Sequence, residues 1–344
     1  MKKTIILGTQ EDFFLTALIK QNLIYNNFDV IDISFPVSNF KYKNIVDRAR
    51  NLIRKTLFGD KSFKANLKFK ANEDRLRQAL NKLTGKADYA LFFRPDTFPE
   101  HFLYDVKSIS KSLIGYQWDG LKRFPSVEKM IPIFDSFFVF DSKDYSDSKE
   151  QFPNLQYTTN FFFDIPRLLL PQNNFKNEIV YIGSFIKERM PDIFHFISII
   201  AQQKIRFNIN IIVGSKRKIT KTNLPITYSM KHYTYEENIE MVKNASTIID
   251  FNYKLHTGLS FRPFEALCFE KKLITNNRDI KFYDFYKKEN IFIIGEDDEQ
   301  ELENFLHTPY QKIDPAIKQK YSFTNWIHYL LNIQPHLAIN PPVS

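Results

Sequence analysis

The amino-acid sequence predicts an α/β protein with two Rossmann-like domains, each a parallel sheet with crossover helices. Three observations support this fold class. Short apolar runs alternate with helical stretches along the chain, which is the pattern of parallel strands joined by helices. The alternation pauses once, at residues 164–176, and then restarts. The length of 344 residues also suits two domains of ordinary size.

The first half of the chain carries five apolar runs that are typical of strands. The first run is followed by a stretch with apolar side chains at helical spacing, namely Phe13, Phe14, Ala17, Leu18 and Leu23. The expected strands are Thr4–Leu7, Phe28–Ile33, Ala87–Phe93, Ser112–Trp118 and Ser136–Phe140. We expect these elements to form an N-terminal domain over residues 1–165.

The second half repeats the pattern after a polar stretch with two prolines, Asp164–Lys176, which is the best linker candidate. Pro191 is well placed to open a helix that runs to about Lys204. The expected strands are Ile179–Ile182, Ile209–Val213, Thr247–Phe251, Leu273–Thr275 and Ile291–Ile294. Further helices are expected at Glu236–Lys243, Arg262–Glu270, Asp297–Leu306 and Asn325–Ile333. These elements predict a second domain over residues 177–322 and a C-terminal helix and tail over residues 323–344.

The composition is that of a soluble globular protein, with 43% hydrophobic and 25% charged residues. We interpret the 35 phenylalanines mainly as core-filling residues. The single cysteine, Cys268, excludes an intrachain disulfide and fits a reducing compartment. No apolar run approaches the roughly 18 residues that a membrane-spanning helix needs. We therefore expect a cytoplasmic protein, either soluble or bound peripherally to a membrane.

The positive charge is concentrated in one stretch of the first half. Residues 41–86 contain fourteen Lys and Arg against four acidic residues, whereas the whole chain has a net charge of +9. Apolar residues are interspersed there, namely Ile45, Leu52, Ile53, Leu57 and Phe58. The stretch indicates either contact with an anionic inner-membrane surface or an ordinary solvated helix face. It contains no recognised nucleic-acid motif, so no nucleic-acid partner is expected.

Several motifs of cofactor and metal chemistry are absent from the sequence. There is no Gly-x-Gly, no Gly-Lys-Ser/Thr phosphate loop, no His/Cys cluster with zinc spacing and no Asp-x-Asp. We therefore expect no cofactor and no metal. A phosphate ligand would then be held by backbone N–H groups, helix N-termini and basic side chains.

Three segments of the second half offer such groups. Gly183 and Ser184 end a strand, and Arg189 follows near the start of a helix. Gly214 and Lys216 repeat this arrangement after the next strand. The third segment is the strongest, because a loop containing glycine runs into a helix that carries Arg262 and Glu265 on one face. Its candidate donor-binding residues are Gly258, Leu259, Ser260, Arg262 and Glu265. A simple ion pair between Arg262 and Glu265 is the alternative interpretation.

The segment over residues 256–277 resembles the donor-sugar region of two-lobed, GT-B type glycosyltransferases. More narrowly, GLSFRPFEAL, KKLITNN, YQWD and FDSFFVFDSKD resemble bacterial transferases of lipopolysaccharide, capsule and exopolysaccharide assembly. The resemblance implies two Rossmann-like domains that face a cleft, with the acceptor on the N-terminal side and a nucleotide-sugar donor on the C-terminal side. The acceptor would be a glycan or a lipid-linked glycan.

The same resemblance implies that Glu265 contacts the ribose hydroxyls of the donor. Many retaining members carry another glutamate eight positions earlier, where this chain has Thr257, so retention and inversion both stay open. Inversion would need a carboxylate base in the first domain. Asp119 is the first candidate and Asp12 the second, and a fold-stabilising role for Asp119 is an equal alternative. Tyr233 is a candidate for stacking a nucleobase.

Two rival functions remain at this point. One is a nucleotide-sugar epimerase of the same fold, which usually needs several acid and base residues around the sugar. The other is a non-enzymatic protein that binds nucleic acid or an anionic surface through residues 41–86.

Overall fold

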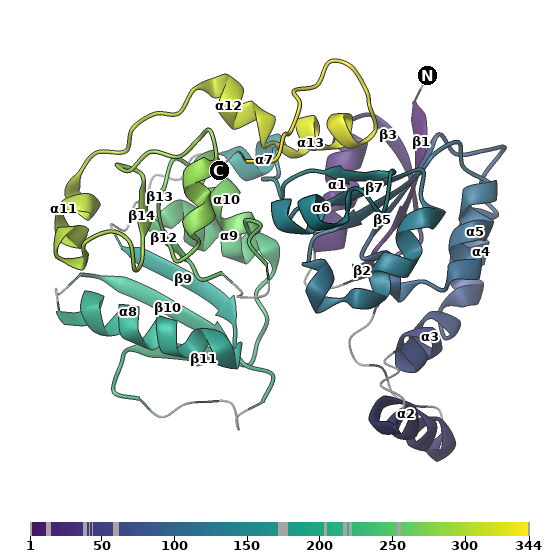
Figure 1. Cartoon of the computed structure of the whole chain (residues 1–344), viewed down its shortest axis with the longest axis horizontal. Coiled ribbons are helices and arrows are strands. Elements are labelled where there is room, and N and C mark those ends of the chain that lie inside the picture. Colours follow the sequence, from purple (N-terminus) through teal and green to yellow (C-terminus); the bar gives the residue numbers. More distant parts are fainter. Residues whose placement is uncertain are drawn as a thin grey trace. The chain divides into compact units, whose positions relative to one another are not determined.

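The computed structural model describes residues 2–11, 15–36, 40, 42, 44–57, 62–170, 178–202, 205–215, 219, 222–252 and 256–342 (Figure 1). The chain forms two compact units. One comprises Met1–Val139 with Asp144–Gln156, and the other comprises Phe140–Lys143 with Tyr157–Ser344. Each unit is built on one six-stranded sheet.

The strands of the first unit are β1 (Lys3–Gly8), β3 (Phe28–Asp32), β5 (Tyr89–Phe93), β6 (Leu113–Gln117), β7 (Ser136–Val139) and β8 (Leu155–Tyr157). They are arranged in the order β3-β1-β5-β6-β7-β8. The pairs β1–β3, β1–β5, β5–β6 and β6–β7 are parallel. The predicted parallel sheet is therefore confirmed. A short parallel pair, β2 (Gln10–Glu11) with β4 (Phe35–Pro36), was not expected.

Helices connect these strands, as the sequence pattern predicts. They are α1 (Leu15–Tyr25), α2 (Ile45–Leu57), α3 (Ser62–Lys70), α4 (Glu73–Leu80), α5 (Glu100–Ser108) and α6 (Ser142–Ser148). Short 3₁₀ helices lie at Pro95–Thr97, Leu121–Arg123 and Pro125–Ile133. Within the described residues, the basic stretch thus forms α2, α3 and α4, and α4 buries Leu76 and Leu80.

Phenylalanine rings fill the core of this unit. Phe92 and Phe98 meet edge to face with ring centroids 4.9 Å apart, and Phe98 stacks on Phe102. In β6, a Cβ atom at Gly115 would lie 2.5 Å from the ring of Phe137. Glycine is therefore required there, because the ring lies directly against the strand backbone. The interpretation of the phenylalanines as core-filling residues is confirmed in this unit.

The second unit contains the strands β9 (Ile179–Ser184), β10 (Phe207–Ile212), β11 (Ile226–Ser229), β12 (Thr247–Asp250), β13 (Lys272–Thr275) and β14 (Ile291–Ile293). Their order is β11-β10-β9-β12-β13-β14, and all neighbouring pairs are parallel. The helices are α7 (Pro166–Leu169), α8 (Met190–Gln202), α9 (Tyr235–Asn244), α10 (Phe261–Cys268), α11 (Leu302–His307), α12 (Pro315–Lys320) and α13 (Phe323–Leu330). The sequence did not predict β11, because only two of its four residues are apolar.

The boundary of the second unit differs from the expected one. Residues 157–165 and the C-terminal helix belong to this unit. The Phe162 N–H donates to the Tyr321 carbonyl at 3.0 Å, and the Phe323 N–H donates to the Phe162 carbonyl at 2.8 Å. The ring of Phe161 lies 4.4 Å from that of Trp326. The boundary of the second unit is therefore set by aromatic packing and by the two backbone hydrogen bonds of Phe162, and not by the composition of the chain.

Two consecutive lysines, Lys271 and Lys272, are buried in the second unit. The Lys271 ammonium donates to the Lys243 carbonyl at 2.7 Å, and that of Lys272 donates to the Phe305 carbonyl. Burial lowers the pKa of each of these lysines to about 8, because the surrounding protein solvates the charged form poorly.

Replacing Lys271 by Met is expected to raise the melting temperature at neutral pH. At neutral pH the folded wild-type protein holds the charged Lys271 side chain in its interior, which lowers its stability. This loss of stability decreases only as the pH rises from about 8, the pKa in the folded protein, toward 10.5, the ordinary lysine value. We expect a gain of about 1–2 kcal/mol near pH 7, because a lost hydrogen bond offsets part of the removed charge penalty. Melting curves near pH 7 and about pH 10 test this. A difference that does not shrink at the higher pH, or that also appears in the exposed control Lys122→Met, contradicts it.

Among the described residues, no helix is both long enough and apolar enough to cross a bilayer.

Candidate functional site

The sheet of the second unit reverses its strand order between β9 and β12. The chain passes outward from β9 to β10 and β11, and then from β12 to β13 and β14 on the other side. Open parallel sheets bind ligands beyond the carboxyl ends of the strands at such a switch point. Gly183 and Ser184 end β9, and Asp250 ends β12. The loop that follows β12 leads into α10, which carries Arg262 and Glu265.

Arg262 and Glu265 form a direct ion pair at the start of α10. Arg262 Nη1 donates to Glu265 Oε2 at 2.5 Å, and Nη2 lies 3.5 Å from the carbonyl oxygen of Ile182 in β9. The Glu265 side chain is 2% exposed and that of Arg262 is 17% exposed. Arg262 and Glu265 therefore share one face of the helix, as predicted. They form the ion pair that was the alternative interpretation of the sequence.

Ser260 connects this pair to the end of β12. Its hydroxyl donates to Asp250 Oδ1 at 2.9 Å and accepts the N–H of Arg262 at 3.2 Å, so that it caps α10. Burial raises the pKa of Asp250, and the Ser260 hydroxyl and the charges of Arg189 and Arg262 offset part of that rise. Arg189 therefore belongs to the same charged group.

Two tyrosines border the charged group. Burial raises the pKa of Tyr181, and the nearby Arg189 lowers it in part. Burial, followed by the negative charge of Glu265, raises the pKa of Tyr235 well above its usual value. Both phenols therefore stay neutral at physiological pH, close to the charges of Arg189 and Glu265.

The segment before α10 is held through its backbone by side chains from other parts of the second unit. Asp141 Oδ2 accepts the N–H groups of Thr257 at 2.5 Å and Gly258 at 3.1 Å, while Oδ1 accepts the Thr257 hydroxyl at 3.1 Å. Asn277 donates to the Thr257 carbonyl at 2.8 Å, and Asn160 donates to the Leu259 carbonyl at 2.9 Å. These bonds fix the backbone of residues 257–259.

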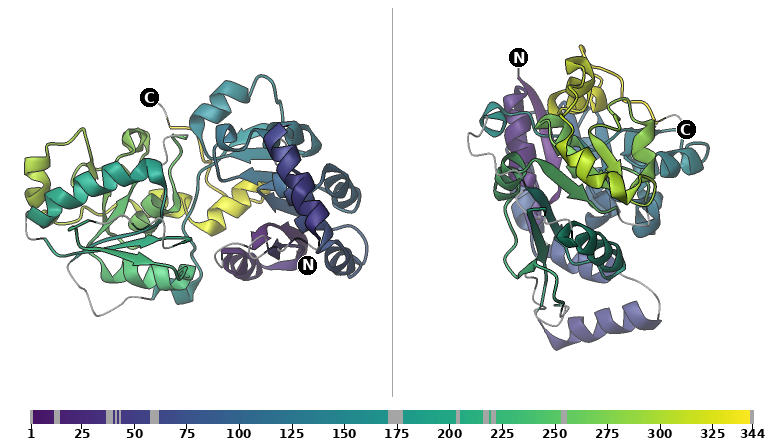
Figure 2. Two further views of the ribbon diagram at one scale, coloured as in Figure 1. Left: turned by 90° about the horizontal axis from the view of Figure 1, so that it is seen from below. Right: turned by 90° about the vertical axis from the view of Figure 1, so that its left-hand side faces the viewer.

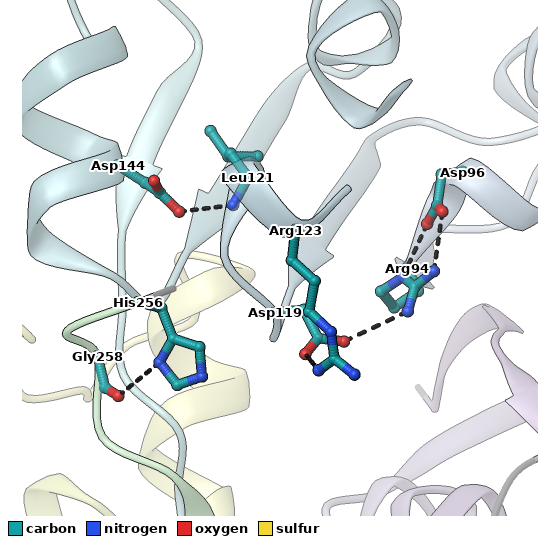
Figure 3. Close-up of polar contacts among 8 residues, drawn as sticks. All are labelled: Arg94, Asp96, Asp119, Leu121, Arg123, Asp144, His256 and Gly258. Atoms are coloured by element: carbon teal, nitrogen blue, oxygen red, sulfur yellow. Dashed lines mark hydrogen bonds and ion pairs between the residues drawn. The ribbon is translucent and has the colours of Figure 1, made fainter. Parts of the chain in front are cut away.

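Gly258 is required by this packing. A Cβ atom there would lie 2.8 Å from the Phe140 carbonyl oxygen and 2.7 Å from its ring. The His256 ring also packs against Phe140, and His256 Nδ1 lies 3.2 Å from the Gly258 carbonyl (Figure 3). Because the Gly258 N–H binds Asp141, it is already occupied and is not offered to a phosphate. Leu259 is buried in the core beneath the loop.

The remaining candidates of the second unit lie elsewhere. Tyr233 packs against the cluster formed by Val180, Ile182 and Ala245, and its hydroxyl donates to Asn210 at 3.4 Å. This contact gives Tyr233 a packing role. Gly214 is exposed after β10, and Lys216 lies outside the described residues.

Asp119 lies in the first unit, within a network of arginines (Figure 3). Its two oxygens accept from Arg94 at 3.3 Å and from Arg123 at 2.6 Å. Arg94 is also held by Asp96 through two bonds of 2.8 Å, and its guanidinium lies 3.5 Å from the centre of the Phe124 ring. Both carboxylate oxygens of Asp119 are thus bound by guanidinium groups, which favours the fold-stabilising alternative. The second candidate, Asp12, lies outside the described residues.

Sequence reasoning missed several members of the site. Asp250 is the last residue but one of the predicted strand Thr247–Phe251, so the rule that ligands gather at strand ends could have found it. Asp141 follows another predicted strand, but its partners Thr257 and Gly258 lie more than a hundred residues away. In the sequence, Tyr181 and Tyr235 resemble ordinary buried aromatic residues. Only the charged residues near them in the folded protein indicate that they border the site.

Among the residues that the structure describes, no group of three or more His, Cys, Asp or Glu side chains is arranged to hold a metal ion.

Comparison with known proteins gives matches only at the level of structure. No protein-family model matches the chain, and no curated protein matches it in sequence. The N-terminal domain of trehalose-6-phosphate phosphatase from Candida albicans has a TM-score of 0.60 at 7% identity, covering 97% of both chains. An alpha-glucosyltransferase in complex with UDP and DNA has a TM-score of 0.51 at 12% identity, covering 89% of both chains. UDP-GlcNAc 2-epimerase from Methanocaldococcus jannaschii has a TM-score of 0.50 at 12% identity, covering 92% of this chain and 95% of its own.

These similarities concern the fold. Two parallel six-stranded sheets, each with its own helices, match the pair of Rossmann-like domains in these structures. The chain therefore has the α/β architecture of two Rossmann-like domains known as the GT-B type.

Proposed function

We propose that the protein is a glycosyltransferase that moves a sugar from a nucleotide-sugar donor to a glycan acceptor. The observation that carries the proposal is the hydrogen-bonded group of Arg262, Glu265, Ser260 and Asp250 at the strand-order switch of the second sheet, in which both carboxylates are buried. The fold is shared with an alpha-glucosyltransferase whose structure holds UDP. The acceptor would be a surface glycan, and we favour one that is linked to a lipid.

A nucleotide sugar presents an anionic diphosphate and neighbouring ribose hydroxyls, and the site has a counterpart for each. Arg262 and Arg189 carry the positive charge that a diphosphate needs. The N-terminus of α10 adds the positive end of its dipole. Glu265 is a carboxylate that can accept from ribose hydroxyls once Arg262 turns toward the phosphate. The ion pair of the ligand-free protein would then exchange one partner for the donor.

Binding of the donor can be tested by thermal shift against a panel of nucleotide sugars. A ligand that binds only the folded protein raises its melting temperature by mass action. The donor that does so is then incubated with candidate acceptors, and the products are separated. A panel in which no nucleotide sugar shifts the melting temperature contradicts the proposal.

An epimerase is the second candidate, because UDP-GlcNAc 2-epimerase shares the fold. The two functions differ in their products. Epimerisation yields a new nucleotide sugar with no acceptor present, whereas transfer needs an acceptor and releases the nucleotide. One incubation with donor alone and one with donor and acceptor distinguish them.

Sugar transfer is expected to survive EDTA. The sequence lacks Asp-x-Asp, and Arg189 and Arg262 supply cations for the departing diphosphate. The check is the initial transfer rate with and without the chelator. Complete loss of activity that magnesium or manganese restores would show that a metal stabilises the leaving group instead.

A further inference from the structure

Helix α2 carries an apolar stripe that faces solvent. Its apolar residues recur at a spacing that gathers them on one helix face; they are Ile45, Val46, Leu52, Ile53 and Leu57. All five are exposed, from 49% for Ile53 to 85% for Ile45. The half-buried residues of this helix are instead polar, Asp47 and Asn51. The helix therefore directs its polar edge inward and its apolar face outward.

This orientation is the reverse of that of the other long amphipathic helix. Helix α8 has the same length and buries Met190, Ile193, Phe196, Ile197 and Ile200 against its sheet. By contrast, Figures 1 and 2 show α2 standing apart from the sheet of its unit, with α3 adjoining it. Exposing several large aliphatic side chains together is unfavourable in water, and such a face marks an interaction site.

The charges around the stripe identify the kind of partner. At 100° per residue, the apolar arc spans roughly 140°, with Arg50 at one edge and Arg48 at the other. Arg54 lies on the polar face, where its guanidinium is 5.0 Å from the ring of Phe63 in α3. Helix α3 adds Lys64, Lys68 and Lys70 with no acidic residue. An apolar face bordered by basic side chains matches an anionic lipid surface.

Other occupants fit this surface less well. A second copy of α2 would bring arginine edges against arginine edges, which repel each other. Nucleic acid would satisfy the cations but would leave the apolar stripe in water. We propose that α2 inserts its apolar stripe into the headgroup region of an anionic bilayer, with the basic residues of α2 and α3 against the lipid phosphates. The inference is independent of the donor site, because lipid binding needs no sugar substrate.

Vesicle co-sedimentation of the full chain tests this surface. We expect binding to vesicles of phosphatidylcholine with phosphatidylglycerol and much weaker binding to phosphatidylcholine alone. Each basic side chain near the surface contributes about fivefold to the binding constant. Leu52→Ser with Ile53→Ser should weaken binding to anionic vesicles at least about tenfold, because two inserted side chains are lost. Arg48→Glu with Arg50→Glu should abolish the preference for anionic vesicles.

A matched control is available in the second unit. Leu169 and Leu170 are also exposed, and Leu169→Ser with Leu170→Ser should leave vesicle binding unchanged. Because the substituted α2 side chains are exposed, the melting temperature should stay the same in those variants. Equal binding to both vesicle types overturns the proposal, as does unchanged binding of the Leu52/Ile53 variant. If the wild-type protein forms a dimer without lipid and the Leu52/Ile53 variant is monomeric, the apolar stripe binds a second copy of the chain instead.

Discussion

Replacing Glu265 by Gln is expected to weaken binding of the donor by about one to two decades in the dissociation constant, because a charged acceptor contributes roughly 1.5–3 kcal/mol to a hydrogen bond. The substitution keeps the shape of the side chain and retains an oxygen toward Arg262, which it contacts at 2.5 Å. The fold should therefore persist. Calorimetric titration with the donor identified by thermal shift measures the effect.

Arg262 is expected to act mainly on the rate of transfer, since negative charge grows on the departing diphosphate in the transition state. Arg262→Lys is the informative change, because Arg262→Ala would leave the buried Glu265 carboxylate unpaired and cost about 3–5 kcal/mol of stability. The lysine retains the charge but loses the planar, forked donor geometry. We expect a lower kcat with a smaller change in donor affinity.

The competing explanation is that the pair serves only the fold. Each single substitution would then lower the melting temperature, while donor affinity of the remaining folded protein would stay at the wild-type value. Melting curves recorded beside the titrations distinguish the two roles. Loss of a donor contact lowers the donor affinity, whereas loss of a structural contact lowers the melting temperature.

Asp141→Ala is expected to abolish measurable transfer while leaving most of the protein folded. The substitution removes three hydrogen bonds, from the Thr257 N–H, the Thr257 hydroxyl and the Gly258 N–H. Each bond to a charged group contributes about 1.5–3 kcal/mol, so the loop before α10 should lose its fixed conformation. A disordered loop must be ordered again on donor binding, which weakens affinity as well as rate. Asp141 is therefore a positioning residue.

Asp144 provides the matched control for this prediction. It is buried to a similar degree and accepts the Leu121 N–H at 2.7 Å in the first unit. Asp144→Ala should lower stability without changing donor affinity. Asp141→Asn should be intermediate in effect, because one acceptor oxygen becomes an amide that cannot accept an N–H. If Asp141→Ala binds donor as the wild type does, the loop is not held for the donor.

Most of the sheet architecture was predictable because buried parallel strands are short, nearly continuous apolar runs. The run Ala87–Phe93 and the structural strand β5 (Tyr89–Phe93) agree closely for this reason. Very short strands and strands with few apolar residues were not predictable. Strand β11 alternates with polar residues, and β2 and β4 have two residues each. Their stability comes from pairing with another strand, and a single stretch of sequence does not display it.

The candidate site was predictable only in part, for a related reason. Arg262 and Glu265 are three residues apart on one helix, and helical spacing alone brings them together. Asp141 and Thr257 are joined by the fold across 116 positions, and no local pattern contains that information. Asp119 is the converse case, since its place after a strand is compatible with a base or a structural role, and only the fold brings Arg94 and Arg123 to it.

The backbone hydrogen bonds that join Phe162 to the C-terminal part of the second unit bear on how that unit folds during synthesis. The Phe162 backbone bonds to Tyr321 and Phe323, which leave the ribosome some 160 positions later. Contacts of such long sequence separation form late, because the entropy of closing the loop must be overcome first. Phe161 meets Phe323 edge to face and Phe163 stacks on it, so these contacts would be missing while the six strands of the sheet emerge. Nascent chains would leave part of these aromatic rings uncovered until α13 arrives, and transiently exposed apolar surface of this kind favours aggregation.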